Sequence, residues 1–263
     1  MADADALLEP GVSGIPAAPD PAPATPPAVP PADESIMSLV DHLGELRSRL
    51  FKALIAIGAG SAVGYYFATD IRKFLQLPLG PLPLQVLGVG DAFVIQIKIS
   101  LVVGIILAMP VLLYQIWAFV APGLTTAERK TIRPWIPLAL VFFVIGVVIA
   151  YVILPFALAF LFSFTDDTLQ AHPAAGPYFD FVTTLFLVFG LIMEFPILLV
   201  GLSKVGIVTS ERLSGQRRMI ILGIAIFAAV VTPGGDIVSP IVLGTTMYIL
   251  FELTALYIKR TGK

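Results

Sequence analysis

The sequence predicts an all-α membrane protein with six transmembrane helices, and three observations carry that prediction. Of the 263 residues, 57% are hydrophobic and only 13% are charged, whereas soluble domains average about 25% charged residues. The mean hydropathy is +0.94. Apolar runs close to the ~20 residues that one membrane-spanning helix needs recur along the chain. A soluble globular fold is therefore excluded.

The first 35 residues differ from the rest of the chain. They are rich in Ala and Pro, are acidic, and contain no Lys or Arg. Because no apolar period is present, residues 1–35 are predicted to be a disordered tail, with a docking tail for a partner as the functional alternative. They lack the basic start and long apolar core of a signal peptide. The membrane domain is expected over residues 36–260, and residues 261–263 form a short C-terminal tail.

Six apolar stretches are the candidate spans: Leu50–Ala68, Ala92–Val120, Pro134–Leu154, Phe179–Leu202, Met219–Val231 and Ile241–Ile258. The second contains Pro110, where a kink is expected. The fifth is the weakest, because its residues cover only about 20 Å of a ~30 Å hydrocarbon core. The sixth is also short. Spans five and six are expected to form a hairpin that thins the membrane locally, unless span five starts at Arg217 or earlier with its arginines snorkelling.

Basic residues set the predicted orientation. Most of the 16 Lys and Arg lie in segments that would share one side of the membrane, whereas the other side holds Arg72 and Lys73. The positive-inside rule then makes both termini cytoplasmic. An even number of spans agrees with this orientation.

The sequence shows no catalytic, cofactor or metal site. It contains no Cys and only two His, His42 and His172, and no nucleotide-binding or hydrolase motif is present. An intramembrane hydrolase is disfavoured, because both histidines lie outside the spans. A solute transporter would show an internal repeat between its halves, and no convincing repeat exists. The net charge of −2 gives no sign of nucleic-acid binding. We therefore expect a protein that is not an enzyme.

Glu194 is the most informative single residue, because it lies deep in the fourth apolar span. A carboxylate at that depth costs roughly 2.5–3.5 kcal/mol on insertion scales and usually serves a purpose. Pro196 follows it and is expected to bend the span. Three roles compete for Glu194: hydrating a groove, contacting a polar group on a partner helix, or taking part in proton-linked movement.

Three further polar residues lie within the spans. Lys98 is either a partner for Glu194 or a side chain that snorkels to the surface. Glu252 is expected to snorkel toward Lys259 or Arg260 at least as readily as to serve a function. Gln115 is most simply an interhelical hydrogen-bonding residue.

A series of short motifs follows in order along the chain: Asp41–Leu50, Ala92–Lys98, Leu107–Pro110, Leu113–Leu124, Glu128–Lys130, Phe189–Pro196, Val231–Pro233 and Tyr248–Glu252. Together they resemble the TatC family, the multi-spanning receptor subunit of twin-arginine protein translocases. The resemblance covers about Ser38 to Arg260. One departure is Ser239-Pro240, where the family usually has Ser-Gln; this puts a polar contact with a partner helix in doubt.

The resemblance implies a substrate: a folded precursor whose signal peptide carries two adjacent arginines. Residues Glu45, Arg47, Phe119 and Glu128 are the expected signal-peptide site. A guanidinium pairs bidentately with a carboxylate, which lysine does poorly, and Phe119 adds apolar or cation–π contact. Simpler readings are also open. Glu45 and Arg49 are spaced to pair on one helix, where Leu43, Leu46 and Leu50 form an apolar face before span one. Glu128 could only cap a helix or pair with Arg129 and Arg133.

The resemblance also implies partners and an energy source. Single-span TatA/TatB-type subunits would form the conduit, the protonmotive force would drive export, and the chain would self-associate in the lipid bilayer. Thr232 is expected to contact a partner helix or to cap a helix. Asp236 is assigned to the same contact, or more simply to the turn amides. The expected location is the bacterial or archaeal cytoplasmic membrane, or an organelle equivalent.

Overall fold

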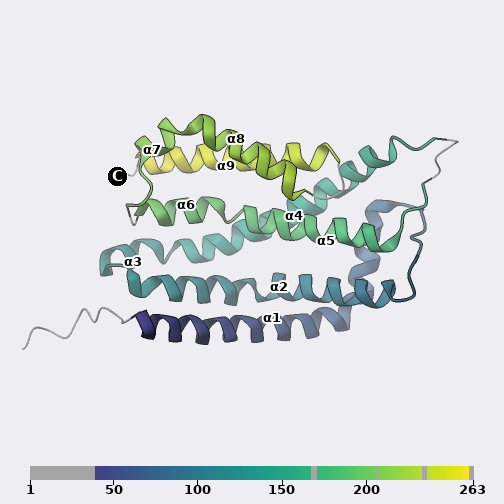
Figure 1. The fold of residues 1–263 in the computed structure, drawn as a ribbon, viewed down its shortest axis with the longest axis horizontal. Helices are drawn as coiled ribbons and strands as arrows, with labels where there is room; N and C mark the ends of the chain where they lie inside the picture. Colours follow the sequence, from purple (N-terminus) through teal and green to yellow (C-terminus); the bar gives the residue numbers. More distant parts are fainter. Residues whose placement is uncertain (1–38, 167–170, 205, 233–235, 261–263) are drawn as a thin grey trace, which may run out of the picture.

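The computed structural model describes residues 39–166, 171–204, 206–232 and 236–260, and these are almost entirely helical (Figure 1). One isolated bridge, between Gln85 and Ala174, is the only β pairing among them. The predicted tails 1–35 and 261–263 lie outside the described residues, as does the turn at 233–235.

The first two spans form a long, close pair. Helix α1 (Leu39–Gln76) is 38 residues long, so the predicted amphipathic segment and span one are one continuous helix. The short 3-10 helix η1 (Leu77–Leu79) follows, and α2 (Asp91–Val120) then runs unbroken through Pro110. A Cβ on Gly60 would lie 2.6 Å from the carbonyl oxygen of Gly104. The two backbones touch at this crossing because neither glycine carries a side chain.

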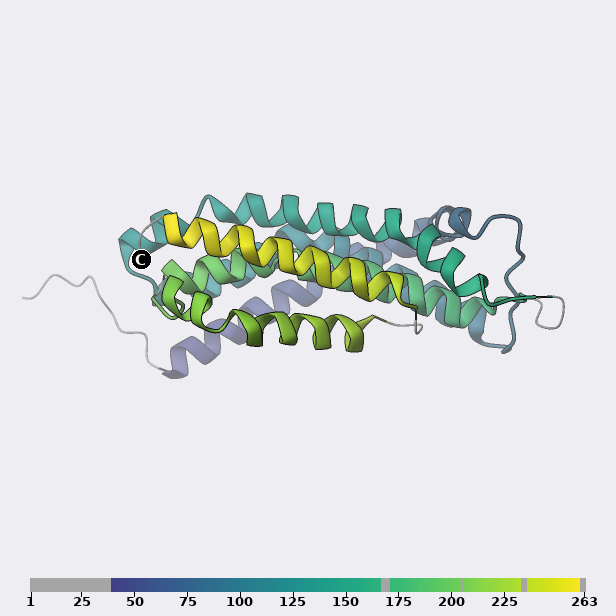
Figure 2. The same cartoon turned by 90° about the horizontal axis from the view of Figure 1, so that it is seen from above.

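The third span is longer than predicted. After η2 (Ala121–Gly123) and α3 (Thr126–Ile132), α4 extends over Trp135–Phe162, past the predicted end at Leu154 and through Pro155. Transmembrane helices tolerate an internal proline, because neighbouring groups can satisfy the freed carbonyl. Figure 2 shows α4 changing direction toward its C-terminal end. The prediction that this span ends at Leu154 was therefore wrong.

The fourth span is interrupted, whereas the sequence predicts only a bend at Pro196. It consists of α5 (Ala175–Ile192) and α6 (Phe195–Lys204), with Glu194 in the turn between them. Helix α5 supplies much of the core, and Phe179 and Phe189 are each 1% exposed. They belong to a hydrophobic cluster whose fully buried members also include Leu154 of α4, Leu185 of α5 and Phe251 of the last helix.

The last three helices form the other edge of the bundle. They are α7 (Ser210–Gly215), α8 (Arg217–Val231) and α9 (Val238–Arg260). At 15 residues α8 covers about 22 Å and begins at Arg217, the start that the alternative prediction gave, and its crossing of the membrane stays a prediction. At 23 residues α9 covers about 34 Å, so the prediction of a short sixth span was wrong. Helix α9 is longer than the apolar run Ile241–Ile258, because it also includes Ser239 at its start and Lys259 and Arg260 at its end.

Five helical segments in the described part of the chain are long and apolar enough to cross a membrane: His42–Leu79, Asp91–Gly123, Thr126–Phe162, Ala175–Lys204 and Val238–Arg260. Helix α8, the fifth expected span, is not among them, because its 15 residues fall short of that length. The count of six spans stays a prediction.

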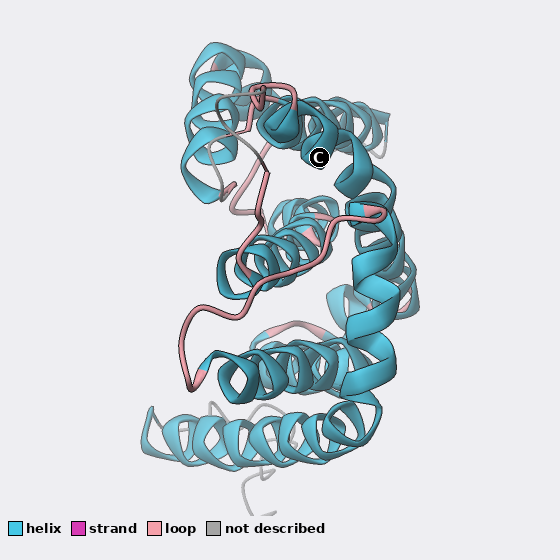
Figure 3. Cartoon of the chain, turned by 90° about the vertical axis from the view of Figure 1, so that its right-hand side faces the viewer, coloured by secondary structure: helices cyan, strands magenta, loops and turns pink. Residues whose placement is uncertain are grey.

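The helices lie side by side, with α1 at one edge and the α8–α9 hairpin at the other (Figures 1 and 3). The start of α1, helices α3 and α7, and the end of α9 share one end of the bundle. We call it the basic end, from Arg49, Arg129, Arg212 and Arg260. The described chain thus begins and finishes at the same end.

The opposite, far end is held by backbone contacts between two loops. The amide of Gln85 donates to the carbonyl of Pro173 at 3.0 Å, and Ala175 donates to the carbonyl of Gln85 at 2.7 Å. Nearby, the Tyr178 hydroxyl donates to the carbonyl of Leu75 at 2.6 Å. The loop after α1 is therefore fixed to the start of α5.

Candidate functional site

A polar cluster joins α1 to α2 at the basic end. Arg49 donates through Nε to Oε1 of Glu45 at 2.9 Å, and its Nη2 bonds the same oxygen. Its Nη1 reaches Oε1 of Gln115 on α2 at 3.5 Å. The two charged residues are one helical turn apart, so the predicted i,i+4 pair is present. Gln115 is confirmed as an interhelical hydrogen-bonding residue.

The second carboxylate oxygen of Glu45 has no such hydrogen bonds. Oε2 is buried and accepts no hydrogen bond among the described residues. Nδ1 of His42 lies 3.9 Å from it, at ion-pair but not hydrogen-bond distance. The His42 ring stacks on Phe119 with centroids 4.3 Å apart and planes 16° from parallel. The structure thus brings Glu45 and Phe119 together, with His42 between them.

The other two expected signal-site residues make separate contacts. Glu128 forms a capping box at the start of α3, accepting from the amide of Thr125 at 2.9 Å and from its hydroxyl at 2.8 Å. Glu128 therefore caps α3, as the simpler alternative expected. The neighbouring Arg129 donates to the carbonyl of Ala121. The guanidinium of Arg47 lies 5.9 Å from the ring centroid of Phe51. Their role in signal binding stays a prediction.

Glu194 lines an apolar groove of about 460 Å³ between α5, α6, α8 and α9. It is the single ionisable residue among those that line the groove, which include Leu191, Phe195, Ile220 and Met247. Its Oε1 is buried and has no hydrogen-bond partner in the described chain. An apolar groove with one unsatisfied acceptor suits a ligand or helix that supplies a single donor.

Two intramembrane charges have partners that the sequence did not predict. Lys98 of α2 forms an ion pair with Asp180 of α5, not with Glu194. Glu252 of α9 forms an ion pair with Arg217 at the start of α8, instead of reaching toward Lys259 or Arg260. Both pairs join different helices, so neither followed from spacing along one helix.

The α8–α9 hairpin keeps its polar residues buried. Thr232 is 9% exposed and donates its hydroxyl to the carbonyl of Ala228. Asp236 is 5% exposed and accepts from the amide of Ser239 in the first turn of α9 through Oδ1, as expected for a residue that satisfies turn amides. Asp236 Oδ2 and the Ser239 hydroxyl are buried without hydrogen bonds to other described residues. Contact of Thr232 or Asp236 with a partner helix stays a prediction.

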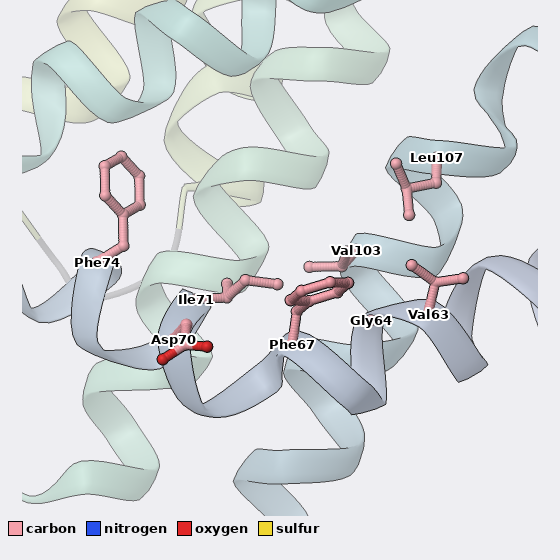
Figure 4. Close-up of a pocket in the computed structure, with 8 residues that line it drawn as sticks. All are labelled: Val63, Gly64, Phe67, Asp70, Ile71, Phe74, Val103 and Leu107. Atoms are coloured by element: carbon pink, nitrogen blue, oxygen red, sulfur yellow. The ribbon is translucent and has the colours of Figure 1, made fainter.

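A second groove, of about 450 Å³, lies along α1 and α2 (Figure 4). Figure 4 shows the side chains of Phe67 and Val103 converging from the two helices. Asp70 is the one ionisable residue that lines it. The groove offers packing for apolar groups and little polar chemistry. No cluster of His, Asp and Glu that could hold a metal occurs in the part of the chain that the structure describes.

Sequence reasoning missed His42 as part of the cluster around Glu45, whereas the i,i+4 spacing of Arg49 from Glu45 predicted their pair. For His42, only the i,i+3 spacing to Glu45 was visible, and the stack on Phe119 depends on how α1 packs against α2.

Comparison with known proteins gives the same family from sequence and structure. Residues 41–245 match the family of the Sec-independent protein translocase protein (TatC). The protein of that name from Carboxydothermus hydrogenoformans is 35% identical over 225 residues, which cover 84% of this chain and 93% of the relative. The chloroplastic counterpart from Arabidopsis thaliana is 33% identical over 88% of this chain and 69% of its own length.

Solved structures agree with that assignment. A crystal structure of the twin-arginine translocase receptor TatC is 34% identical, with a TM-score of 0.73 over 84% of this chain and 100% of the solved chain. A second crystal structure, in the detergent DDM, has the same TM-score at 33% identity. With its apolar membrane helices, this chain is a membrane component of protein transport, and it belongs to the TatC family of twin-arginine translocase proteins.

Proposed function

We propose that this chain is the signal receptor and core subunit of its translocase. In this proposal the basic end faces the cytoplasm and binds the twin arginines of a precursor's signal peptide. The chain then organises single-span TatA/TatB-type partners, and the protonmotive force drives export of the folded precursor. The positive-inside rule supports this orientation, because the basic residues gather at that end.

The observation that carries the receptor role is Oε2 of Glu45, which is buried and accepts no hydrogen bond among the described residues. A buried carboxylate oxygen without a donor loses free energy that an incoming cation can restore. The Phe119 ring beside it offers an apolar face for the same side chain. An arginine that bonds Oε2 and packs near Phe119 would use both groups. The site therefore favours a positively charged, planar group from the cytoplasmic side.

The groove around Glu194 supports a role in receiving a partner helix. A membrane helix that carries one polar side chain could donate to Oε1 while its apolar residues fill the groove. In a bilayer such a bond is worth about 1 kcal/mol, which is enough to set register but not to bind alone. Partner recruitment would then depend on apolar packing with one polar contact.

The receptor role can be tested with the full chain in lipid nanodiscs. Labelled peptides with an Arg-Arg or a Lys-Lys signal are titrated against the wild type and Glu45→Gln, and dissociation constants are measured by anisotropy. Glu45→Gln should weaken Arg-Arg binding by about tenfold or more, since a charge-assisted hydrogen bond is lost. Equal binding of both peptides to the wild type, or an unchanged affinity in Glu45→Gln, would remove the assignment.

Glu211→Gln is the matched control. Glu211 is an exposed acid on α7 at the same end of the bundle. Its backbone N–H and the hydroxyls of Ser210 and Thr209 hold the pKa of its carboxyl below the usual range, so it is ionised at neutral pH. This variant removes the same charge from the basic end and should leave peptide binding unchanged.

A further inference from the structure

His42 lies between the two groups that would meet a signal arginine. Its ring stacks on Phe119 with centroids 4.3 Å apart, and its Nδ1 is 3.9 Å from Oε2 of Glu45. Within 4 Å of this carboxylate the described chain places two basic side chains, Arg49 at Oε1 and His42 at Oε2. A shift of about 1 Å along the Phe119 ring would bring Nδ1 to hydrogen-bond distance. His42 is therefore placed to donate to the buried oxygen that accepts no bond.

We propose that His42 makes signal binding depend on pH: its protonated ring and the signal arginine compete for Oε2 of Glu45, so that binding of the signal releases a proton. This inference rests on the proposed receptor function and names a regulation of the same site. His42 acts through Glu45 and need not touch the signal peptide, so it is a positioning residue.

The competition follows from the two forms of a histidine. A neutral imidazole carries no charge, whereas the protonated ring donates from both nitrogens and would form a charge-assisted bond to Oε2. Histidine changes between these forms from pH 5 to 8. A signal arginine at Oε2 would take the place of that bond and put a second cation beside the ring. Because linkage is reciprocal, the bound signal disfavours protonation of His42, and protonation disfavours the signal.

The other groups around His42 do not change their charge in this way. Arg49 shares the Glu45 carboxylate and opposes a second cation there, but an arginine stays charged throughout this range. On α2, Phe119 contacts the ring and Gln115 lies near Arg49, and neither side chain titrates. Glutamate, lysine and arginine ordinarily keep their charges from pH 5.5 to 8. The ionisable residues of α3, the next helix after Phe119, are Glu128, Arg129 and Lys130.

The exposure of the pair suits a proton exchange. The side chain of His42 is 39% exposed and that of Glu45 is 18% exposed. The ring can therefore take its proton from water. The carboxylate is shielded enough that a neighbouring charge acts on it more strongly than it would in bulk water.

The test titrates an Arg-Arg signal peptide against the full chain in zwitterionic nanodiscs from pH 5.5 to 8. The peptide is capped at both ends and contains no His, Asp or Glu, so it does not titrate itself. The wild-type dissociation constant should rise roughly fivefold or more as the pH falls. His42→Phe keeps an aromatic ring beside Phe119 and cannot take a proton, so its affinity should not vary with pH.

His172→Phe is the matched control. His172 is the only other histidine in the chain, and it lies exposed before α5 at the far end of the bundle. This variant should keep the pH dependence of the wild type. An equal loss of pH dependence in His172→Phe would contradict the assignment to His42.

Proton release gives a second measurement, which a merely structural role of His42 would not change. Calorimetric titrations at pH 6.5, in two buffers with different enthalpies of ionisation, count the protons released for each peptide bound. The wild type should release a fraction of one proton, and His42→Phe should release none. Thermal unfolding checks that each variant is folded, and His42→Gln replaces His42→Phe if the latter does not fold.

The outcomes separate this inference from the proposed function. A wild-type affinity that does not change with pH, or binding without proton release, overturns the inference. A pH dependence that persists in a folded His42 variant also overturns it, because another group would then titrate. If Glu45→Gln loses Arg-Arg binding at pH 8 and the wild type shows no pH dependence, the receptor function stands and only this inference fails. If Glu45→Gln binds like the wild type at pH 8, the receptor function itself fails.

Discussion

Two glutamates at different depths in the molecule, Glu45 and Glu194, differ in the partners of their carboxylate oxygens. Glu45, near the basic end, has one oxygen bonded by Arg49 and the other within ion-pair distance of His42. Glu194, inside the fourth span, lies in an apolar groove with an oxygen that has no partner among the described residues. The first carboxylate is held by a cation of its own helix. The second carboxylate has an acceptor oxygen for which the described part of the chain supplies no donor.

The most direct test of this comparison is the sign of the change in unfolding free energy when each glutamate is replaced by leucine. Glu45→Leu leaves Arg49 without its acceptor and should destabilise the fold by roughly 1–3 kcal/mol. Glu194→Leu removes an unsatisfied buried acceptor and should be neutral or stabilising by a similar amount. Thermal unfolding in one detergent measures both. Destabilisation by both variants would show that Glu194 has a partner in the folded chain.

Transport should respond to Glu194 in the opposite sense to stability. Glu194→Leu should strongly reduce export of a twin-arginine precursor in membrane vesicles, since the groove loses its acceptor. Glu194→Gln keeps a hydrogen-bonding group and should retain most of the export. If Glu194→Gln were as inactive as Glu194→Leu, the ionised or protonating carboxyl would be required, and proton-linked movement would become the favoured role.

The close approach of α1 to α2 at Gly60 and Gly104 gives the next test. We expect this contact to hold the residues around Glu45 against α2. A Cβ on Gly60 would lie 2.6 Å from the backbone of Gly104, so Gly60→Ala should cost roughly 1–3 kcal/mol and weaken signal binding. Gly58 lies on the same helix with nothing within 4 Å of its Cβ, and Gly58→Ala should be tolerated. Equal effects on peptide affinity would mean that the crossing does not position the site.

The Lys98–Asp180 pair should give a smaller effect. It joins α2 to α5, and interhelical polar contacts in membranes are worth about 1 kcal/mol. A double-mutant cycle with Lys98→Met and Asp180→Leu should return a coupling free energy of that size. A coupling of zero would show that the pair does not form in the bilayer.

The Arg217–Glu252 pair should give the smallest effect. The side chains are 51% and 29% exposed, and solvent-accessible pairs contribute about 0–1 kcal/mol. Glu252→Gln should therefore change the unfolding temperature little. A large loss of stability would mean that this pair sets how α8 docks on α9.

The sequence could predict the apolar helices and a distortion of the fourth span near Pro196, because apolar runs and prolines act locally, but it did not predict the full break between α5 and α6. It could also predict the Glu45–Arg49 pair, since one helical turn separates the two residues. It could not predict the partners of Lys98 and Glu252, which come from other helices and depend on packing. The length of α4 was missed because Pro155 was taken as a stop, although an internal proline is tolerated in a membrane helix.

The backbone link between Gln85 and Ala174 has a consequence for the order in which this protein is made. Synthesis completes α1, α2 and α4 before Ala174 emerges, so the polar backbone groups of Gln85 wait until these three helices have been made. Such non-local closures form late, after local helix pairs have assembled. A nascent chain halted after α4 would already hold its glycine-packed helix pair, yet its far end would still be open.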